Sequence, residues 1–183
     1  MPYEIHVLNG SCLRPDRLIA MSRRIEEIFA VQVSVGRAAL DTRTVYDTSR
    51  RQTNSTQLLA QILEGVRDHE IKRIGVVDVD LFIPILTFVF GEAQLGGPAA
   101  VVSTHRLSNQ FYGLVRNDDL MLQRLEKELV HELGHTFGLY HCRQFECVMR
   151  ASTYVEEIDL KRVYPCEACA VELSRHSQVL STE

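Results

Sequence analysis

The chain has 183 residues, of which 45% are hydrophobic and 24% are charged. This composition is typical of a soluble globular protein that can bury one core, so we expect one compact unit. The formal net charge is -4, and acidic and basic residues are mixed along the chain. An extended basic surface for nucleic acid or for an anionic membrane is therefore not expected.

No part of the sequence has the pattern of a targeting signal or of a membrane span. Residues 1–6 include neither the basic stretch nor the apolar stretch of a secretory signal. The longest apolar run, Leu81–Phe90, is interrupted by Pro84 and falls short of the ~18 residues that cross a bilayer. We therefore expect a cytoplasmic protein without membrane contacts, and we assign this run to buried strands. The sequence does not fix the oligomeric state, for which a monomer is one option.

The first part of the chain alternates between strand and helix patterns. Tyr3–Leu8 has the two-residue alternation of a strand, and Arg14–Phe29 has apolar residues at helical spacing. Val31–Val35 alternates again. The polar segment Asp41–Thr53 has too few apolar residues for a core element, so we predict a long loop that is either functional or a plain connection.

A second helix and a buried strand follow this loop. Asn54 or Ser55 can cap a helix whose apolar residues extend to Val66. Ile71–Val79 is rich in β-branched residues, as in a strand that is covered on both faces. Strand and helix have then alternated twice, which is the pattern of an α/β fold.

Two further strands, Thr87–Phe90 and Ala99–Ser103, are predicted on either side of the turn-forming sequence Gly96-Gly97-Pro98. A tight turn joins antiparallel neighbours, so at least one strand near the edge of the sheet departs from the parallel order. The predicted sheet is therefore mixed.

Residues 117–138 are predicted to form a helix. Asn117 can cap it, and the two aspartates that follow place negative charge in its first turn. Four leucines form one stripe along the helix: Leu122, Leu125, Leu129 and Leu133. Gly138 can take the left-handed conformation that ends a helix. A short helix from about Tyr154 to Val163 and a polar tail are expected after it.

The segment from His131 to His141 matches the pattern HExxHxxGxxH at every fixed position. Residues four apart share one helix face, so His131 and His135 can direct ring nitrogens at one metal. A turn at Gly138 brings His141 back as a third ligand. A chance match, with the histidines on a solvated or a core face, is the alternative, and agreement at all five fixed positions argues against it.

Three neutral ligands leave the fourth position of a tetrahedral zinc ion to water, which is the pattern of a catalytic site. Zinc lowers the pKa of that water to about 7. Glu132, next to the first ligand, can act as the general base that accepts the proton and later delivers it to a leaving amine. Chemistry of this kind requires no organic cofactor.

Four of the five cysteines lie in the last quarter of the chain: Cys142, Cys147, Cys166 and Cys169. In a cytoplasmic protein this cluster indicates a closed, structural zinc site of four thiolates, and hence two zinc ions per chain. A redox role of the CxxC pair is the alternative, but the pair does not follow a strand-to-helix start. Cys12 stands alone and is interpreted as a small, buried or half-buried hydrophobic residue and not as a reactive thiol.

The complete pattern, HExxHxxGxxHC followed by C-x-M and by CxxC, resembles the archaemetzincin family of the metzincin peptidases. Met149 then corresponds to the methionine of the Met-turn, although a methionine that only fills a gap in the core would pack similarly. The resemblance extends through Asp78–Phe82 and Phe88–Ala93, and so covers essentially the whole catalytic core.

The resemblance implies a metzincin-like α/β fold: a mixed twisted sheet with flanking helices, an active-site helix at its base, and a short C-terminal subdomain stapled by zinc. Residues 1–141 are expected to form the catalytic core and residues 142–183 the subdomain, in one compact unit. A cleft is implied beneath the edge strand. If Phe88–Ala93 is that strand, an extended peptide can pair with it over the zinc, with Gly91 allowing close approach. An inhibitory N-terminal plug is not expected, because the first strand begins by Tyr3.

The favoured function is hydrolysis of peptide bonds by a zinc-activated water, with peptides or unfolded polypeptide segments as substrates. Two alternatives stay open. The same site could hydrolyse a substrate other than a peptide, because zinc, water and glutamate activate a nucleophile whatever the carbonyl. The protein could also be a zinc-binding module without catalysis, which the cysteine cluster favours and the presence of Glu132 disfavours.

Overall fold

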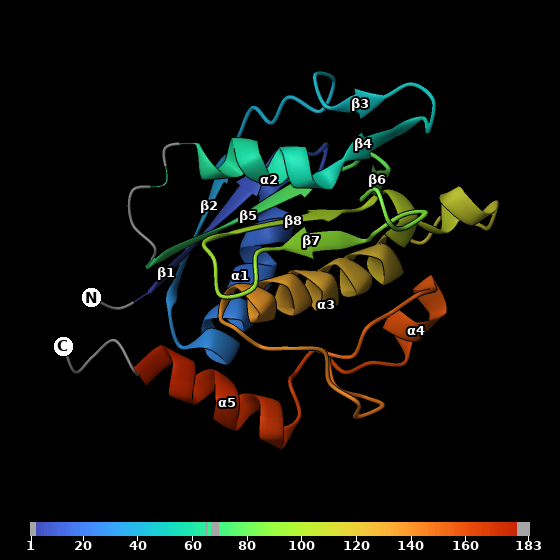
Figure 1. Ribbon diagram of the computed structural model, residues 1–183. Helices are drawn as coiled ribbons and strands as arrows, with labels where there is room; N and C mark the ends of the chain where they lie inside the picture. The colour runs from blue at the N-terminus through green and yellow to red at the C-terminus, as the bar shows by residue number, and fades with distance from the viewer. Residues whose placement is uncertain (1–2, 65, 67–69, 179–183) are drawn as a thin grey trace.

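The computed structural model describes residues 3–64, 66 and 70–178, with the side chains of 177 and 178 left aside. A five-stranded sheet has the order β2-β1-β5-β8-β7 (Figure 1). Its strands, in chain order, are β1 (Glu4–Asn9), β2 (Gln32–Arg37), β5 (Ile71–Val77), β7 (Gly91–Ala93) and β8 (Ala99–Ser103). All neighbouring pairs are parallel except β7 with β8. The sheet is therefore mixed, as predicted.

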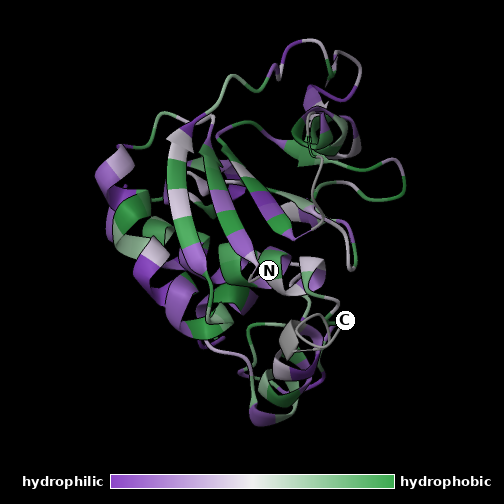
Figure 2. Ribbon diagram, turned by 90° about the vertical axis from the view of Figure 1, so that its left-hand side faces the viewer, coloured by the Kyte–Doolittle hydropathy of each residue, from purple (hydrophilic) through white to green (hydrophobic). Residues whose placement is uncertain are grey.

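Helices cover both faces of this sheet. Helices α1 (Pro15–Phe29) and α3 (Asp118–Thr136) pack on one face, and α2 (Ser55–Leu63) packs on the other (Figure 1). The apolar residues of β8 require cover on both faces: Ala100 and Val102 are buried in the core with α1 and α3, whereas Ala99 and Val101 are buried with α2. Figure 2 shows the corresponding alternation of hydrophobic and hydrophilic residues along the strands near the viewer.

The predicted loop Asp41–Thr53 contains two short strands and belongs to a second, smaller sheet. Strands β3 (Tyr46–Asp47), β4 (Gln52–Asn54) and β6 (Leu81–Phe82) pair in this order. The prediction missed β3 and β4 because most of their residues are polar, so their burial is not visible as an apolar pattern, whereas β6 lies in the apolar run that was assigned to buried strands. Gln52 and Thr53 are nevertheless buried, with 7% and 1% of their surface exposed.

The predicted strand Thr87–Phe90 is wrong, although Ala99–Ser103 is confirmed. The edge strand β7 begins only at Gly91, and the preceding loop makes a single antiparallel bridge, between Val89 and Leu81. The physical reason is that the carbonyl groups of Leu86 and Thr87 accept hydrogen bonds from a side chain, that of Arg50, and not from a neighbouring strand.

After α3, the chain packs back on the core, in which Val148, Val155, Ile158 and Leu173 are buried. Helix α4 (Val155–Asp159) is shorter than the predicted helix, and α5 (Glu167–Gln178) lies where a polar tail was predicted. Between β8 and α3, two short 3-10 helices span His105–Leu107 and Asn109–Tyr112. No helix in the described part of the chain is long and apolar enough to cross a membrane.

Candidate metal centres and the cleft beside them

Helix α3 carries the first two residues of the predicted zinc site. The Asn117 side chain caps the helix by accepting a hydrogen bond from the backbone N–H of Leu120 at 3.0 Å. His131 and His135 lie on one helix face, with ring centroids 4.7 Å apart. Gly138 then takes a φ of +90°, and the chain turns so that the His141 ring lies 4.8 Å from the His135 ring. The three predicted ligands are thus brought together.

Backbone carbonyls orient two of the rings. Nδ1 of His131 lies 2.8 Å from the Val148 carbonyl oxygen, and Nδ1 of His135 lies 2.7 Å from that of Leu139. A carbonyl only accepts, so each Nδ1 carries the proton and each Nε2 keeps its lone pair. Burial lowers the pKa of all three imidazoles, with further lowering by Lys161, so the neutral form that binds metals is favoured.

The geometry of the rings fits zinc. The Nε2 atoms of His131 and His135 are 3.1 Å apart, and one ring nitrogen from each histidine lies within 4.8 Å of the others. Nitrogen ligands that share a tetrahedral zinc ion, at about 2.05 Å each, are about 3.3 Å apart. Only a small adjustment would therefore be needed for the three side chains to hold the ion.

Glu132 lies beside the histidines with 5% of its surface exposed. Burial raises the pKa of this carboxyl well above its ordinary value, and the nearby carboxylate of Glu128 raises it further. The strand β7 approaches the side chain closely, because a Cβ atom at Gly91 would lie 2.7 Å from both Cγ and Oε1 of Glu132. Gly91 is thus required by the packing of α3 against the edge strand.

A cleft of about 490 Å³ opens beside Glu132 and the three histidines. One side is formed by residues 83 and 86–93, which comprise β7 and much of the loop before it. The other side is formed by residues of α3 and by Ala151–Thr153. The cleft expected beneath the edge strand is therefore present, and the candidate zinc ligands are part of its lining.

One buried ion pair near this cleft was not predicted. Glu128, four residues before Glu132 and on the same face of α3, lines the cleft. Its Oε1 atom lies 3.7 Å from Nζ of Lys161, whose side chain is fully buried. The spacing of the two glutamates was visible in the sequence, but the contact with Lys161, 33 positions along the chain, depends on how the segment after α4 folds back.

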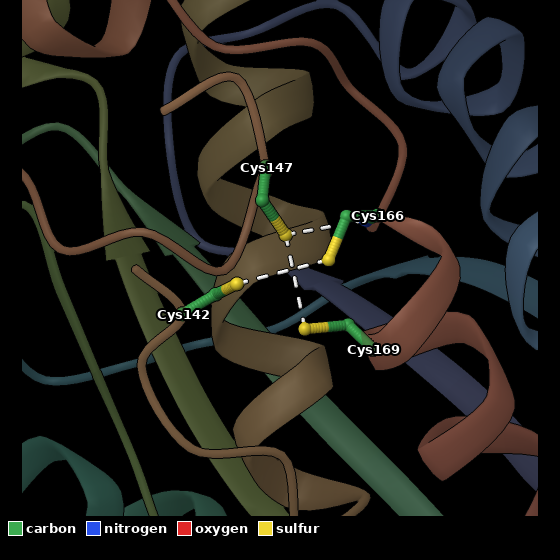
Figure 3. A group of neighbouring side chains, drawn as sticks. All are labelled: Cys142, Cys147, Cys166 and Cys169. Atoms are coloured by element: carbon green, nitrogen blue, oxygen red, sulfur yellow. Dashed lines mark hydrogen bonds between the residues drawn. The ribbon is translucent and has the colours of Figure 1, made fainter. Parts of the chain in front are cut away.

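The four predicted cysteines converge in a second cluster (Figure 3). Cys142 and Cys147 follow α3, whereas Cys166 and Cys169 lie at the start of α5. The Sγ atoms are 3.7 Å apart for Cys142 and Cys166, and 3.8 Å apart for Cys147 and Cys169, and none of the four is in a disulfide. Sulfur ligands of a tetrahedral zinc ion, at about 2.3 Å each, are about 3.8 Å apart.

Two contacts of the cysteine sulfurs also fit a metal site. The backbone N–H groups of Gln144 and Cys166 donate to the sulfurs of Cys142 and Cys147, at 3.4 and 3.2 Å. Such donors stabilise the thiolate form that binds metals. Burial raises the pKa of the Cys147 thiol, so a cation would be needed to keep the whole cluster deprotonated.

Met149 connects the two clusters. Its backbone carbonyl accepts a hydrogen bond from the N–H of Cys142 at 2.9 Å. Its side chain is 1% exposed, and its sulfur packs against Gly134, where a Cβ atom would collide with it. Gly134 lies between His131 and His135 on α3, so the methionine lies under the segment that carries these histidines.

Comparisons with known proteins agree with these observations. The profile of "Peptidase family M54" matches residues 19–175. An archaemetzincin of Thermococcus kodakarensis is 41% identical over 138 residues, which cover 75% of this chain and 74% of that protein. The crystal structure of archaemetzincin from Methanopyrus kandleri has a TM-score of 0.83 and 32% identity, over 96% of this chain and 95% of that chain.

A crystal structure of a zinc-dependent peptidase from Methanocorpusculum labreanum is also similar, with a TM-score of 0.81 and 30% identity, over 92% of this chain and 99% of that chain. The fold and the three-histidine cluster together define the class of metzincin-type metallopeptidases. Within this class, the chain belongs to peptidase family M54, the archaemetzincins. The family resemblance and the metzincin-like α/β fold expected from the sequence are thereby confirmed.

Proposed function

We propose that this protein is a zinc-dependent peptidase that hydrolyses peptide bonds in extended polypeptide segments. The observation that carries the proposal is the convergence of His131, His135 and His141 beside a buried glutamate, in the lining of a cleft bordered by an edge strand. The zinc-dependent peptidase to which the chain is similar supports the choice of metal.

The three histidines would hold the catalytic zinc, which when bound supplies a polarised water and a Lewis acid for the scissile carbonyl. Glu132 is proposed as the general base. Its carboxylate accepts a proton from the attacking water and later donates that proton to the leaving amine. Burial of Glu132 suits both transfers, because a side chain that is 5% exposed can hold the proton away from bulk water between them.

The edge strand β7 supports a polypeptide substrate. It pairs with β8 on one side only within the five-stranded sheet, so a peptide can add to its other side by backbone hydrogen bonds. The side chain of Glu92, on the same strand, is not free to bind a substrate side chain, since its carboxylate accepts hydrogen bonds from Ser55 and Thr56. Recognition would therefore rest on the backbone and on the cleft, which suits extended or unfolded segments.

The four cysteines are proposed to hold a second, structural zinc ion, because four thiolates leave no position for substrate. We also propose that residues 142–183 form a subdomain that belongs to the same compact unit as the core, residues 1–141. In the described part of this subdomain, Val148, Met149 and Leu173 are buried in the core cluster that contains α1 and α3.

The test of the activity is Glu132→Ala. Wild-type protein loaded with zinc should cut members of a diverse peptide library, and the variant should lose at least about 100-fold of this rate because the general base is missing. Zinc binding should persist, since Glu132 is not a proposed ligand. Glu126→Ala is the matched control on the same helix, because Glu126 pairs with Arg24 of α1 and does not line the cleft.

Three outcomes of this screen separate the alternatives. Discrete products made by wild type and Glu126→Ala, but not by Glu132→Ala, support the peptidase. Cleavage of ester or amide probes without cleavage of any peptide would favour a hydrolase of another substrate. If wild-type protein binds two zinc ions but turns over no substrate, a zinc-binding module without catalysis would be favoured.

Zinc stoichiometry gives an independent test. Native mass spectrometry of the loaded protein should show two zinc ions per chain, with the one at the cysteines released last under chelator because four thiolates bind it. His141→Ala should retain that tightly held ion and weaken the other. A wild-type protein that never binds more than one zinc ion would contradict the assignment of two sites.

A further inference from the structure

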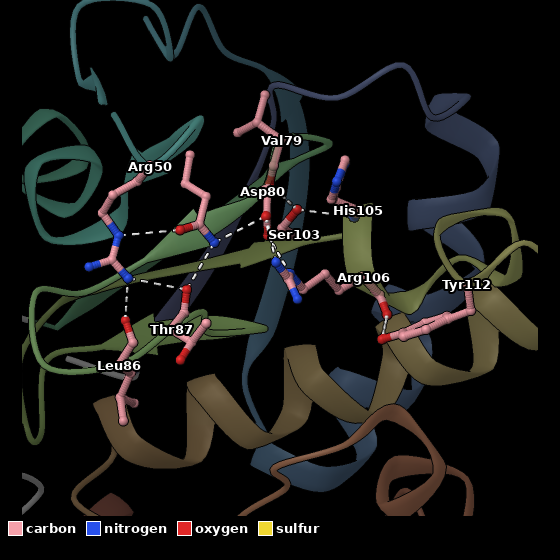
Figure 4. A network of polar contacts seen from close by, with 10 residues as sticks. Arg50, Val79, Asp80, Leu86, Thr87, Ser103, His105, Arg106 and Tyr112 are labelled. Carbon is pink, nitrogen blue, oxygen red and sulfur yellow. Dashed lines mark hydrogen bonds and ion pairs between the residues drawn. The ribbon is translucent and has the colours of Figure 1, made fainter. Parts of the chain in front are cut away.

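Most of the loop between β6 and β7, residues 83–90, lines the cleft. Its backbone accepts hydrogen bonds from polar side chains that do not line the cleft (Figure 4). The guanidinium group of Arg50 donates to the carbonyl oxygens of Leu86 at 2.6 Å and of Thr87 at 3.2 Å. The side-chain amide of Gln52 donates to the same Thr87 carbonyl at 3.0 Å. The loop is therefore fixed by side chains of the segment before α2, although no strand pairs with it at this point.

Asp80 joins this anchoring to the other end of the loop. Its carboxylate accepts a bidentate pair from Arg106, at 2.5 and 2.7 Å, and a third hydrogen bond from the Gln52 amide at 3.0 Å. Only 13% of the Asp80 side chain and 18% of the Arg106 side chain are exposed. A bidentate pair fixes both position and orientation, so Asp80 sets the geometry of Gln52 and Arg106 together.

Arg106 in turn holds the aromatic part of the cleft. Its guanidinium carbon lies 4.1 Å from the centroid of the Phe88 ring, and Phe88 contacts Phe90 edge to face at 5.3 Å. Both phenylalanines line the cleft. The Tyr112 hydroxyl donates to the Arg106 backbone carbonyl at 2.9 Å and so fixes the arginine from its other side. The apolar wall is thus connected to Asp80 through one cation–π contact.

The opposite side of the cleft is built from small residues, Ala151, Ser152 and Thr153, together with Glu128. The charge of Glu128 is balanced by the buried ammonium group of Lys161. The cleft has a volume of about 490 Å³, and Ile83, Leu86 and the two phenylalanines are part of its lining. It therefore has room for a large side chain, and these groups favour an apolar one.

We propose that Asp80 and Arg50 are positioning residues that hold loop 83–90 as a preformed wall, and that this wall selects substrates with a bulky apolar side chain beside the scissile bond. The inference rests on the proposed peptidase function. Because the wall is ordered before the substrate arrives, binding does not have to order the loop. Loss of the anchors should therefore change substrate affinity and selectivity much more than the chemical step.

The test compares two peptides that differ only in having phenylalanine or alanine at each position next to the cleaved bond. For one such position, wild-type protein should show a KM about tenfold lower for the phenylalanine peptide than for the alanine peptide. Asp80→Asn and Arg50→Met should each reduce this ratio of KM values to less than about threefold. The kcat of each variant should differ from that of wild type by less than about threefold. Arg50→Lys, which keeps one donor for the loop carbonyls, should restore part of the preference. Asp16→Asn is the matched control, because Asp16 forms the same bidentate pair with Arg14 on the exposed surface of α1.

Arg50→Met keeps the test valid if Asp80→Asn does not fold. It leaves the pair of Asp80 and Arg106 intact and keeps an aliphatic stem next to the Phe82 ring, over which the Arg50 guanidinium lies at 4.2 Å. Anchors that served only stability would lower the melting temperature without changing the ratio of the two KM values. An unchanged ratio in both folded variants, or a wild-type protein without any preference, overturns the proposal.

A binding measurement separates this inference from the peptidase itself. Fluorescence anisotropy of the labelled phenylalanine peptide can be followed with zinc-loaded Glu132→Ala, which requires no turnover. Adding Arg50→Met to this background should weaken binding about tenfold, with little effect on the alanine peptide. If wild-type protein cuts no peptide but this difference is observed, the proposed function fails and the selective wall stands. Equal binding of both peptides before and after the substitution refutes the wall alone.

Discussion

At the scale of single residues, the candidate zinc site depends on two backbone carbonyls. The Leu139 carbonyl fixes the ring of His135, and the Val148 carbonyl fixes the ring of His131. Any side chain at these two positions leaves the acceptor in place, so the contact depends on the path of the chain and not on the residue type. This is why the three ligands could be predicted from their spacing, whereas the groups that orient them could not.

The cleft shows the same distinction. Glu132 was predicted because the motif fixes its place relative to two histidines. Asp80 was noted only as part of a family resemblance, because nothing in the sequence pairs it with Arg106, 26 positions further on. Lys161 gave no sequence signal either, since a lysine among polar residues is normally exposed. Residues that act through long-range contacts were thus beyond a prediction from local spacing.

A buried lysine outside the site leads to a prediction about stability. Lys72, on β5, is 3% exposed, and burial lowers its pKa to about 8 from an ordinary 10.5. Its Nζ atom donates to the Gly97 carbonyl at 3.3 Å and lies over the rings of Tyr3 and Phe137, at 5.0 and 5.5 Å from their centroids. These contacts favour the charged form, but burial outweighs them.

Between pH 8 and 10.5, the unfolded chain keeps a proton on Lys72 that the folded chain has lost. The unfolded state then binds more protons, so this residue makes the free energy of unfolding rise with pH across that window. Lys72→Met lacks this titration, so it should not show this rise. The free energy of unfolding of the variant, relative to that of wild type, should therefore fall by about 2–3 kcal/mol from pH 7 to pH 10.5. Urea unfolding at both pH values measures the difference, in which other titrating groups cancel. A difference that is independent of pH would contradict the prediction.

At the scale of elements, the sequence predicted those whose apolar residues follow a regular period. The helix expected at Arg14–Phe29 is α1 (Pro15–Phe29), and Ala99–Ser103 is β8. Strand β7 was misplaced because Gly91-Glu92-Ala93 has no residue that favours strands. Helix α5 was missed because Leu173 is the one apolar residue that is fully buried among its described side chains, and its packing otherwise depends on the cysteines at its start.

The N-terminus of α3 gives a prediction for the helix that carries the site. Asn117→Ala removes the acceptor for the Leu120 N–H and should lower the free energy of unfolding by about 1 kcal/mol. Asn117→Asp keeps an acceptor and adds negative charge at the positive end of the helix dipole, so it should remain close to wild type. Zinc affinity should be unchanged in both variants, because the ligands lie at the opposite end of the helix. Urea unfolding followed by circular dichroism measures the first effect, and equal stability of Asn117→Ala and wild type would show that the cap contributes nothing.

At the scale of the whole molecule, the two candidate metal centres share one segment of chain. His141 and Cys142 are adjacent, so their Cα atoms are about 3.8 Å apart and one cannot move without the other. Cys147 precedes Val148, whose carbonyl orients His131. The N–H of Cys142 is bound to the Met149 carbonyl. The cysteine cluster is thus connected to two histidines: to His141 through Cys142, and to His131 through Cys147 and Val148.

This arrangement predicts that the proposed structural zinc supports the proposed catalytic zinc. Cys166→Ser or Cys169→Ser weakens the closed site and frees the segment after Gly138, so ordering His141 then costs entropy whenever the catalytic zinc binds. Affinity at the three histidines should fall about 10- to 100-fold although no ligand there has changed, as is typical when groups that orient metal ligands are lost. Competitive zinc titration against a chromophoric chelator measures this fall, with circular dichroism confirming that the α/β core persists. Cys12→Ser is the matched control and should leave both affinities unchanged, because Cys12 is exposed, and not buried as the sequence suggested, and belongs to neither cluster. If the cysteine variants bind zinc at the histidines as tightly as this control does, the two centres are independent, and the cysteines stabilise the C-terminal segment alone.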